Sequence, residues 1–252
     1  MTEALFFRDL IFGMLALSVV TFVALFVVTA PYGRHTRAGW GPTVPSTVGW
    51  VLMEAPASLG FLGFYLLGEQ RAAAAPLALL ALWQLHYFNR AFVYPFRRRG
   101  GDKPMPLAVA AMGLSFNIAN SYANARFVSH FAHYPAGWLH GARFCGGAAL
   151  FLVGFAINQH ADEVLRSLRA PGERGYKIPR GGLYRFVSAP NYFGELVEWI
   201  GFALAAWSPA ALVFVVWTAA NLLPRAWANH AWYRRTFADY PTERRALVPF
   251  LF

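Results

Sequence analysis

Charged residues are scarce in this chain. They make up 13% of its 252 residues, whereas a soluble domain of this size usually carries about 25%. This deficit leaves too little polar surface to cover a globule in water, so an ordinary soluble protein is excluded. Hydrophobic residues make up 57% of the chain, and the mean hydropathy is +0.38. We therefore expect a polytopic membrane protein.

The chain also lacks a pair of cysteines and any glycine-rich nucleotide-binding motif. The single cysteine, Cys145, excludes an intrachain disulfide and a cysteine-based zinc cluster. No G-x-G-x-x-G or G-x-x-x-x-G-K-[ST] motif occurs, so any nucleotide must be held by arginine and amide side chains instead. His130, His133 and His140 lie close together, but no carboxylate or cysteine is near them, and we expect no metal site.

The chain shows no internal repeat, linker or low-complexity tract, and residues 1–252 are expected to form one domain. Long apolar segments predict an all-α fold of seven transmembrane helices, because a helix needs about 20 apolar residues to cross a bilayer. The first segment lacks a cleavage pattern and is expected to be a retained span. Ser208 and Pro209 predict a tight hairpin between the last two spans. The expected spans are residues 4–30, 46–68, 74–96, 106–125, 141–165, 190–207 and 209–235.

Lysine and arginine are divided unequally between the two faces that these spans define. The face with the N-terminus receives 4 of the 22 basic residues, and the opposite face receives 16, including Arg174. The positive-inside rule therefore predicts an external N-terminus and a cytoplasmic C-terminus. Membrane topology also explains the net charge of +10, and no nucleic-acid partner is expected.

Polar side chains recur at helical spacing inside the expected spans. A charge at mid-helix costs about 2.5–3.5 kcal/mol, so such residues need a reason to be there. Spacings of three, four and seven place them on single helix faces, and we expect these faces to converge on one cavity. Interhelical hydrogen bonding is the alternative; it is favoured for Asn117, Ser121 and Asn124 and open for the acids. The other polar residues are Glu54; Tyr87, Arg90 and Tyr94; Asn158, Asp162, Arg166 and Arg169; Asn191, Glu195 and Glu198; Arg225, Asn229 and Tyr233.

Several stretches resemble the steroid 5α-reductase family from about Tyr32 to the C-terminus. They include "YGRHT", "MEAP", "LHYFNRAFVYP", the run from "INQHADEVLRSLR" to "ELVEWIGFALAAWS", and "FADYPTERRALVPFLF". The resemblance implies a seven-span enzyme that uses NADPH to saturate the Δ4 double bond of 3-oxo-steroids. It also implies a steroid or steroid-like lipid as substrate, contact with membrane lipid, and a monomer. The alanine- and arginine-rich composition of the chain suggests a bacterial inner membrane, or the endoplasmic reticulum if the source is eukaryotic.

The resemblance assigns roles residue by residue. Glu54 and Tyr87 correspond to the pair that binds and polarises the substrate ketone, and Trp199 is expected to line the steroid. The chain departs from the family at Asn229, where a histidine is usual, and at Lys177, where arginine is frequent. The implied cofactor residues are Tyr32, Tyr94, Lys103, Asn158, Asp162, Arg169, Tyr176, Lys177, Asn191, Glu195, Arg225, Asn229 and Tyr233.

Two other classes remain open at this point. An isoprenylcysteine-type methyltransferase would use S-adenosylmethionine and has a similar C-terminal layout, but it gives no role to Glu54 and Tyr87. A transporter would explain buried charges, but the chain shows no inverted repeat or matched pair of broken helices. Binding of NADPH or S-adenosylmethionine separates the two enzyme readings.

Overall fold

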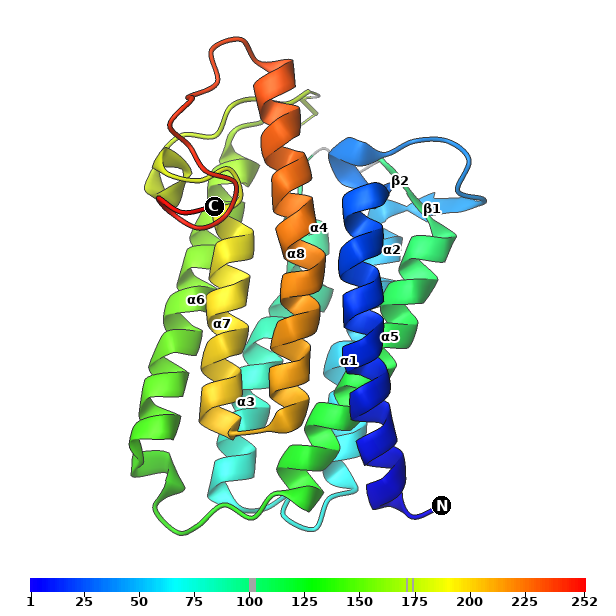
Figure 1. The fold of residues 1–252 in the computed structure, drawn as a ribbon, viewed down its shortest axis with the longest axis vertical. Helices are drawn as coiled ribbons and strands as arrows, with labels where there is room; N and C mark the ends of the chain where they lie inside the picture. The colour runs from blue at the N-terminus through cyan, green and yellow to red at the C-terminus, as the bar shows by residue number, and fades with distance from the viewer. Residues whose placement is uncertain (100–102, 171, 174) are drawn as a thin grey trace.

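A computed structural model describes residues 1–99, 103–170, 172–173 and 175–252, so Arg174, counted above, lies outside the described residues. The chain forms an elongated helical bundle (Figure 1). Its long helices are α1 (Glu3–Val27), α2 (Ser46–Leu66), α3 (Ala74–Phe88), α5 (Leu107–Arg126), α6 (Ala142–Ser167), α7 (Pro190–Ala206) and α8 (Pro209–Thr236). Shorter elements are the 3-10 turns Gly33–His35, Trp138–His140 and Gly182–Arg185, the π segments Asn89–Val93 and Phe127–Phe131, helix α4 (Tyr94–Arg97), and strands β1 (Thr43–Pro45) and β2 (Pro104–Pro106).

Each of the seven predicted segments contains a helix. The third is not uniform, because α3 passes through the π segment Asn89–Val93 into α4. Helices α1, α2, α6 and α8 are long and apolar enough to cross a membrane. Helices α3 and α7, with 15 and 17 residues, are shorter than the roughly 20 residues that a span needs. The predicted hairpin is confirmed: Trp207, directly after α7, has the left-handed conformation (φ 48°), and Ser208 caps α8 by accepting from the Ala211 amide at 3.2 Å.

The all-α prediction missed a small antiparallel pair. Val44 of β1 lies opposite Met105 of β2, with Thr43 opposite Pro106 and Pro45 opposite Pro104. The prolines keep both segments extended. The pair forms because the two strands lead directly into α2 and α5, and these helices pack side by side.

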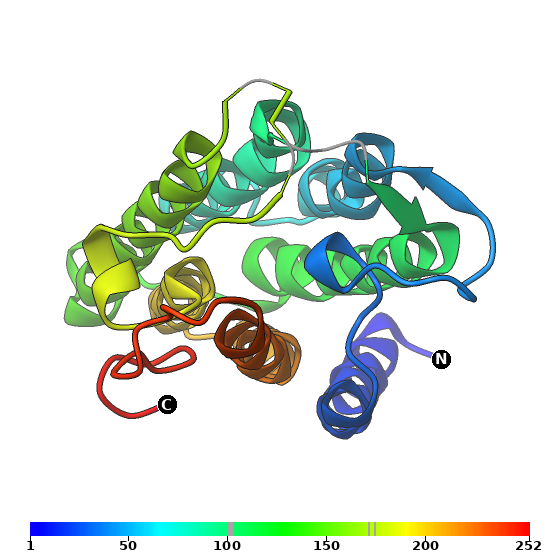
Figure 2. The ribbon, with the colours of Figure 1, turned by 90° about the horizontal axis from the view of Figure 1, so that it is seen from above.

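The two termini lie at opposite ends of the bundle, and the longer connections gather at the end that holds the C-terminal segment (Figure 1). Figure 2 looks onto this end, where the segment that follows α6 runs across the bundle and the C-terminal segment lies beside it. A parallel bridge between Val187 and Arg245 joins these two segments. The candidate site lies among these connections.

Helices α6 and α7 approach each other at the level of their backbones. A Cβ atom on Gly154 would lie 2.3 Å from the Glu198 nitrogen, and one on Gly201 would lie 2.3 Å from the Phe151 nitrogen. The corresponding distances at Gly147 and Gly194 are 2.4 and 2.6 Å, so each helix presents to the other a pair of glycines seven residues apart. Small residues at such spacing let membrane helices come together closely.

Gly154→Ala is therefore expected to lower the free energy of unfolding by about 1–3 kcal/mol or more, because the new methyl group must push two backbones apart. Gly146→Ala is the matched control on the same helix, since its Cβ would meet nothing within 4 Å. Thermal unfolding of the purified protein measures both. Equal melting temperatures for the two variants would contradict this packing.

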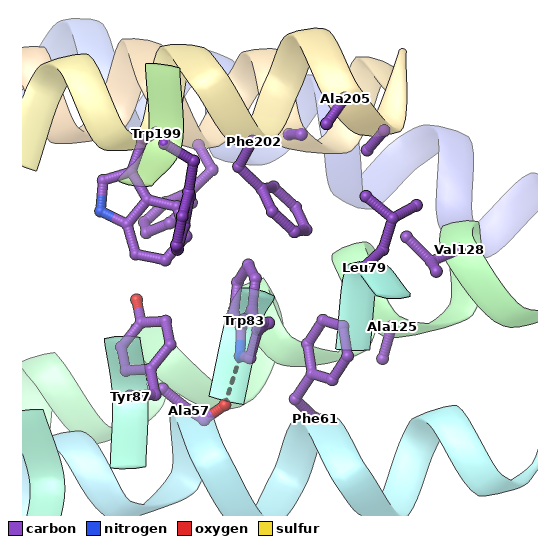
Figure 3. Packing of buried hydrophobic residues seen from close by; sticks show 14 of the residues in the cluster. Ala57, Phe61, Leu79, Trp83, Tyr87, Ala125, Val128, Trp199, Phe202 and Ala205 are labelled. Carbon is purple, nitrogen blue, oxygen red and sulfur yellow. Dashed lines mark hydrogen bonds between the residues drawn. The ribbon is translucent and has the colours of Figure 1, made fainter. Parts of the chain in front are cut away.

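The core below the site is aromatic (Figure 3). Trp83 of α3 stacks on Phe61 of α2 at 4.5 Å between ring centroids and lies 5.3 Å from Trp199 of α7. Its indole nitrogen donates to the Ala57 carbonyl at 2.7 Å, so the one polar atom of this ring is satisfied. Aromatic contacts thus join α2, α3 and α7 around a single side chain.

Hydrogen bonds from α5 fix its position against α2, as the sequence predicts. The Asn117 amide donates to the Met53 carbonyl at 2.7 Å, and the Ser121 hydroxyl donates to the Pro56 carbonyl at 3.1 Å. For Asn124 the prediction was wrong, since its amide donates to Asn120 within α5. One helical turn separates these two asparagines, so the Asn124 amide bonds within its own helix and not to a neighbouring one.

Candidate active site

A cavity of about 250 Å³ opens among α2, α4, α6, α7 and α8 at the end that holds the connections. Its described lining includes nine basic residues and only two acids, Asp162 and Glu163. The polar helix faces predicted from sequence do converge here. Ten of the thirteen predicted cofactor residues line it: Tyr32, Tyr94, Lys103, Asp162, Arg169, Tyr176, Asn191, Arg225, Asn229 and Tyr233.

The other three lie behind or beside the wall. Asn158 donates to the Asn191 carbonyl at 3.0 Å and so supports a lining residue from α6. Glu195 lies 3.8 Å from the Arg90 guanidinium. Lys177 is half exposed and pairs at 2.6 Å with Glu173, four residues earlier in the sequence. The structure therefore separates Lys177 from the cavity.

Arg90 is the lining residue that sequence reasoning noticed but assigned no role. Its guanidinium lies 3.4 Å from Asp162 and over the rings of Trp50 and Tyr94, with centroid distances of 4.8 and 4.4 Å. Asp162 in turn accepts from the Asn191 amide at 3.1 Å. Arg90 thus balances buried acids from α6 and α7 and fixes the wall that they form.

Four guanidinium groups in the lining keep a buried N–H with no acceptor among the described residues. These are Nη1 of Arg34, Nη1 of Arg98, Nε of Arg169 and Nη1 of Arg225. A buried donor without an acceptor is costly, so the wall is incomplete without an anion. Phosphate oxygens match this need, because each accepts charge-assisted hydrogen bonds from arginine.

Aromatic rings hold two of these arginines in place. Arg34 lies over the rings of Tyr233 and Trp232 at 4.4 and 4.9 Å. Arg225 lies over Tyr32 at 3.6 Å and donates from Nε to the Tyr192 hydroxyl at 2.9 Å. Stacking of this kind restricts a guanidinium group without using its N–H donors, so Nη1 of each arginine remains available for a ligand.

Asn229, where the chain departs from the family pattern, lines the cavity and contacts His35 behind it. The imidazole Nε2 lies 3.0 Å from the Asn229 side-chain oxygen. Burial, together with the nearby cations Arg225 and Arg34, lowers the pKa of His35 to about 4. His35 is therefore neutral at pH 7 and donates to Asn229. Burial also raises the pKa of Tyr32 and of Tyr184, so both hydroxyls stay protonated at neutral pH.

Glu54, Tyr87 and Trp199 lie deeper than the cavity and are not part of its lining. The Asn117 amide donates to the Glu54 carboxylate at 3.3 Å. Tyr87 faces Trp199 across the interior (Figure 3), with 5.5 Å between ring centroids. Trp199 is 1% exposed, and its indole nitrogen has no acceptor among the described residues. The Glu54 carboxyl group lies close enough to Tyr87 to act on it electrostatically, so the three predicted residues share one layer of the bundle outside the basic cavity.

Sequence reasoning missed a buried acid–imidazole pair in this layer. His86 Nδ1 lies 2.9 Å from Glu198 Oε1, and the two side chains are 4% and 0% exposed. His86 directly precedes Tyr87, and its ring lies 4.6 Å from that of Trp199. Glu198 belongs to the polar face of α7, but nothing in the sequence indicates its partner 112 residues away.

Comparison with known proteins tests the resemblance. The family model described as 3-oxo-5-alpha-steroid 4-dehydrogenase matches residues 103–252, more than half of the chain. The chain belongs to this family. It is 44% identical over 240 residues to 3-oxo-5-alpha-steroid 4-dehydrogenase 1 of Bos taurus, covering 94% of this chain and 93% of the relative. It is also 42% identical over 243 residues to the steroid 5-alpha-reductase of Gossypium hirsutum, with the same coverage. Family membership argues against the methyltransferase and transporter readings.

Proposed function

We propose that this chain reduces the Δ4 double bond of 3-oxo-Δ4 steroids to 5α-dihydro steroids, with NADPH as the reductant. The observation that carries the proposal is the stacking of two layers: a basic cavity with four unsatisfied guanidinium donors above a buried layer with Glu54, Tyr87 and Trp199. Family membership supports the reaction class.

The lining residues fit a phosphate-bearing cofactor. Arg34, Arg98, Arg169 and Arg225 supply donors for its phosphates, and Asp162, Asn191 and Asn229 offer hydrogen bonds to its uncharged parts. When bound, NADPH supplies the hydride that adds to C5 of the steroid. Its extra phosphate favours a site with surplus cations, as this one has.

Glu54 and Tyr87 polarise the C3 ketone. Hydride addition to the β carbon of an enone places negative charge on the ketone oxygen, and donors aimed at that oxygen stabilise the transition state more than the ground state. The Tyr87 hydroxyl is one donor. Glu54 is the second when it is protonated; an ionised Glu54 would instead orient Tyr87 as its acceptor. Asn117 holds the Glu54 side chain in place.

The chain spans the membrane seven times, with an external N-terminus and a cytoplasmic C-terminus. The separation of the termini and the nine basic residues of the cavity support this arrangement. NADPH then binds from the cytoplasmic side. The steroid, being flat and apolar, enters from the lipid. The membrane is the bacterial inner membrane, or the endoplasmic reticulum membrane if the source is eukaryotic.

The direct test is turnover of progesterone, testosterone and androstenedione by the purified enzyme, with NADPH, NADH and S-adenosylmethionine compared. We expect NADPH-dependent 5α-reduced products. No NADPH-dependent product from any of the three steroids would refute the proposal, as would transfer of a methyl group from S-adenosylmethionine.

Arg169→Ala is expected to raise the apparent Michaelis constant for NADPH about tenfold or more, because a charge-assisted hydrogen bond contributes roughly 1.5–3 kcal/mol. Initial rates at varied NADPH concentration measure it. Arg180→Ala is the control, since Arg180 is 69% exposed and does not line the cavity. An unchanged NADPH dependence in Arg169→Ala would remove this residue from the cofactor site.

A further inference from the structure

Phe186, Phe250 and Leu251 form an exposed apolar patch outside the long helices, called here the C-terminal patch. They are 40%, 74% and 82% exposed, and the rings of Phe186 and Phe250 lie 5.3 Å apart. The patch joins the 3-10 turn after α6 to the end of the chain. Large apolar side chains gathered in this way usually mark an interaction surface.

The backbone holds this patch outward. Phe250 has a φ of 67°, a left-handed conformation that bulky side chains rarely adopt. The turn around it is closed by hydrogen bonds from the Leu251 and Phe252 amides to the Val248 carbonyl, both at 3.1 Å. Leu247, fully buried, anchors the turn from below. Phe250 and Leu251 are thus exposed by a turn that backbone hydrogen bonds close.

An apolar pocket of about 430 Å³ lies beside the patch and shares Phe186 with it. Ile157 and His160 of α6 form one wall, and the turn residues 182–186 form the other. Arg185 lies in the lining with its side chain exposed, and it has no carboxylate partner within the described part of the chain. The pocket therefore combines apolar lining residues with the Arg185 guanidinium group, which no described carboxylate neutralises.

The position of the pocket indicates what fills it. Helix α6 is one of the four candidate membrane spans, and Val153, 54% exposed, lies on the same helix face as Ile157 and His160. The pocket continues this outward-facing stripe toward the end of the bundle where the basic connections gather. Hydrocarbon and an anionic headgroup meet at that depth in a bilayer.

We propose that the pocket and the C-terminal patch bind a phospholipid of the surrounding leaflet, with acyl chain against Phe186, Phe250 and Leu251 and the phosphate at Arg185. The chain end then lies in the membrane interface and not in the aqueous phase. This site lies on the other side of Tyr184 from the basic cavity, since that residue lines both, and its test needs no steroid or cofactor.

The first experiment places an environment-sensitive fluorophore on the patch. Leu251→Cys in a Cys145→Ser background is labelled with a nitrobenzoxadiazole dye in nanodiscs of phosphatidylcholine and phosphatidylglycerol. Thr242→Cys, exposed on the same segment but outside the patch, is the control. We expect blue-shifted emission at position 251, with quenching by nitroxide-labelled lipid and protection from aqueous iodide, and the reverse at position 242. Equal iodide quenching at the two positions overturns the proposal. So does a blue shift at 251 that depends on protein concentration and not on lipid, since it would indicate a second protein copy.

The second experiment tests the headgroup. Phosphatidylglycerol retained through detergent purification is measured by native mass spectrometry for the wild type, Arg185→Gln and Arg180→Gln. One lost cation near a headgroup weakens binding by about fivefold. We expect that loss in Arg185→Gln only. Equal retention in Arg185→Gln and the wild type overturns the assignment of Arg185.

Discussion

Steroid turnover is expected to fall about 10²–10³-fold in Glu54→Ala, and by a similar factor in Tyr87→Phe, because each change removes one donor to the developing oxyanion. Both residues lie in the buried layer beneath the basic cavity, so NADPH binding should be preserved. Turnover with 3-oxo-Δ4 steroids, together with a separate cofactor-binding measurement, checks the result. The double variant should lose less than the product of the two factors, since both donors act on one oxygen.

Glu54→Gln distinguishes the two forms of this mechanism. An amide can still donate to the ketone, so partial activity supports a protonated Glu54 as donor. A loss as large as that of Glu54→Ala supports an ionised Glu54 that orients Tyr87. Near-normal turnover in both Glu54→Ala and Tyr87→Phe would show that the acid serves only to hold α2 against α5 through Asn117.

The second large effect is on stability. His86→Ala is expected to lower the free energy of unfolding by about 3–5 kcal/mol, because it leaves the fully buried carboxyl group of Glu198 without its partner. Reversible unfolding in mixed micelles measures the change. Replacing both residues with apolar side chains of similar size should cost less than His86→Ala alone.

Arg8→Ala provides the control for this experiment. Arg8 also pairs with an acid, Asp9, but the two side chains are 60% and 55% exposed. Exposed pairs contribute little, so this variant should unfold like the wild type. A His86→Ala variant as stable as Arg8→Ala would mean that Glu198 finds another partner.

The helical residues that line the cavity could be predicted, because the pattern that indicates them lies within single stretches of sequence. Asp162, Asn191 and Arg225 each belong to a polar stripe at spacings of three or four, and the structure brings these stripes to one cavity. Apolar length likewise placed all seven helices. The contact between α6 and α7 could also have been found, since Gly147 and Gly154, like Gly194 and Gly201, stand seven residues apart.

What could not be predicted depends on contacts between distant segments. His86 and Glu198 look like unrelated polar residues until α3 packs against α7. Arg34 gives no helical signal, because it lies on a short 3-10 turn held by the rings of Trp232 and Tyr233. Lys177 shows how sequence neighbours diverge: Tyr176 lines the cavity, whereas Lys177 lies outside the described lining and pairs with Glu173.

The backbone contact between α6 and α7 supports only one side of the basic cavity. Gly194 lies against the Asn158 backbone, so Asp162 and Asn191 are fixed by the same contact that joins the helices. Tyr32, Lys103 and Tyr176, on the other side, lie on connections between helices. A ligand in the cavity therefore contacts two kinds of wall: one built from helices that pack backbone to backbone, and one built from connections between helices.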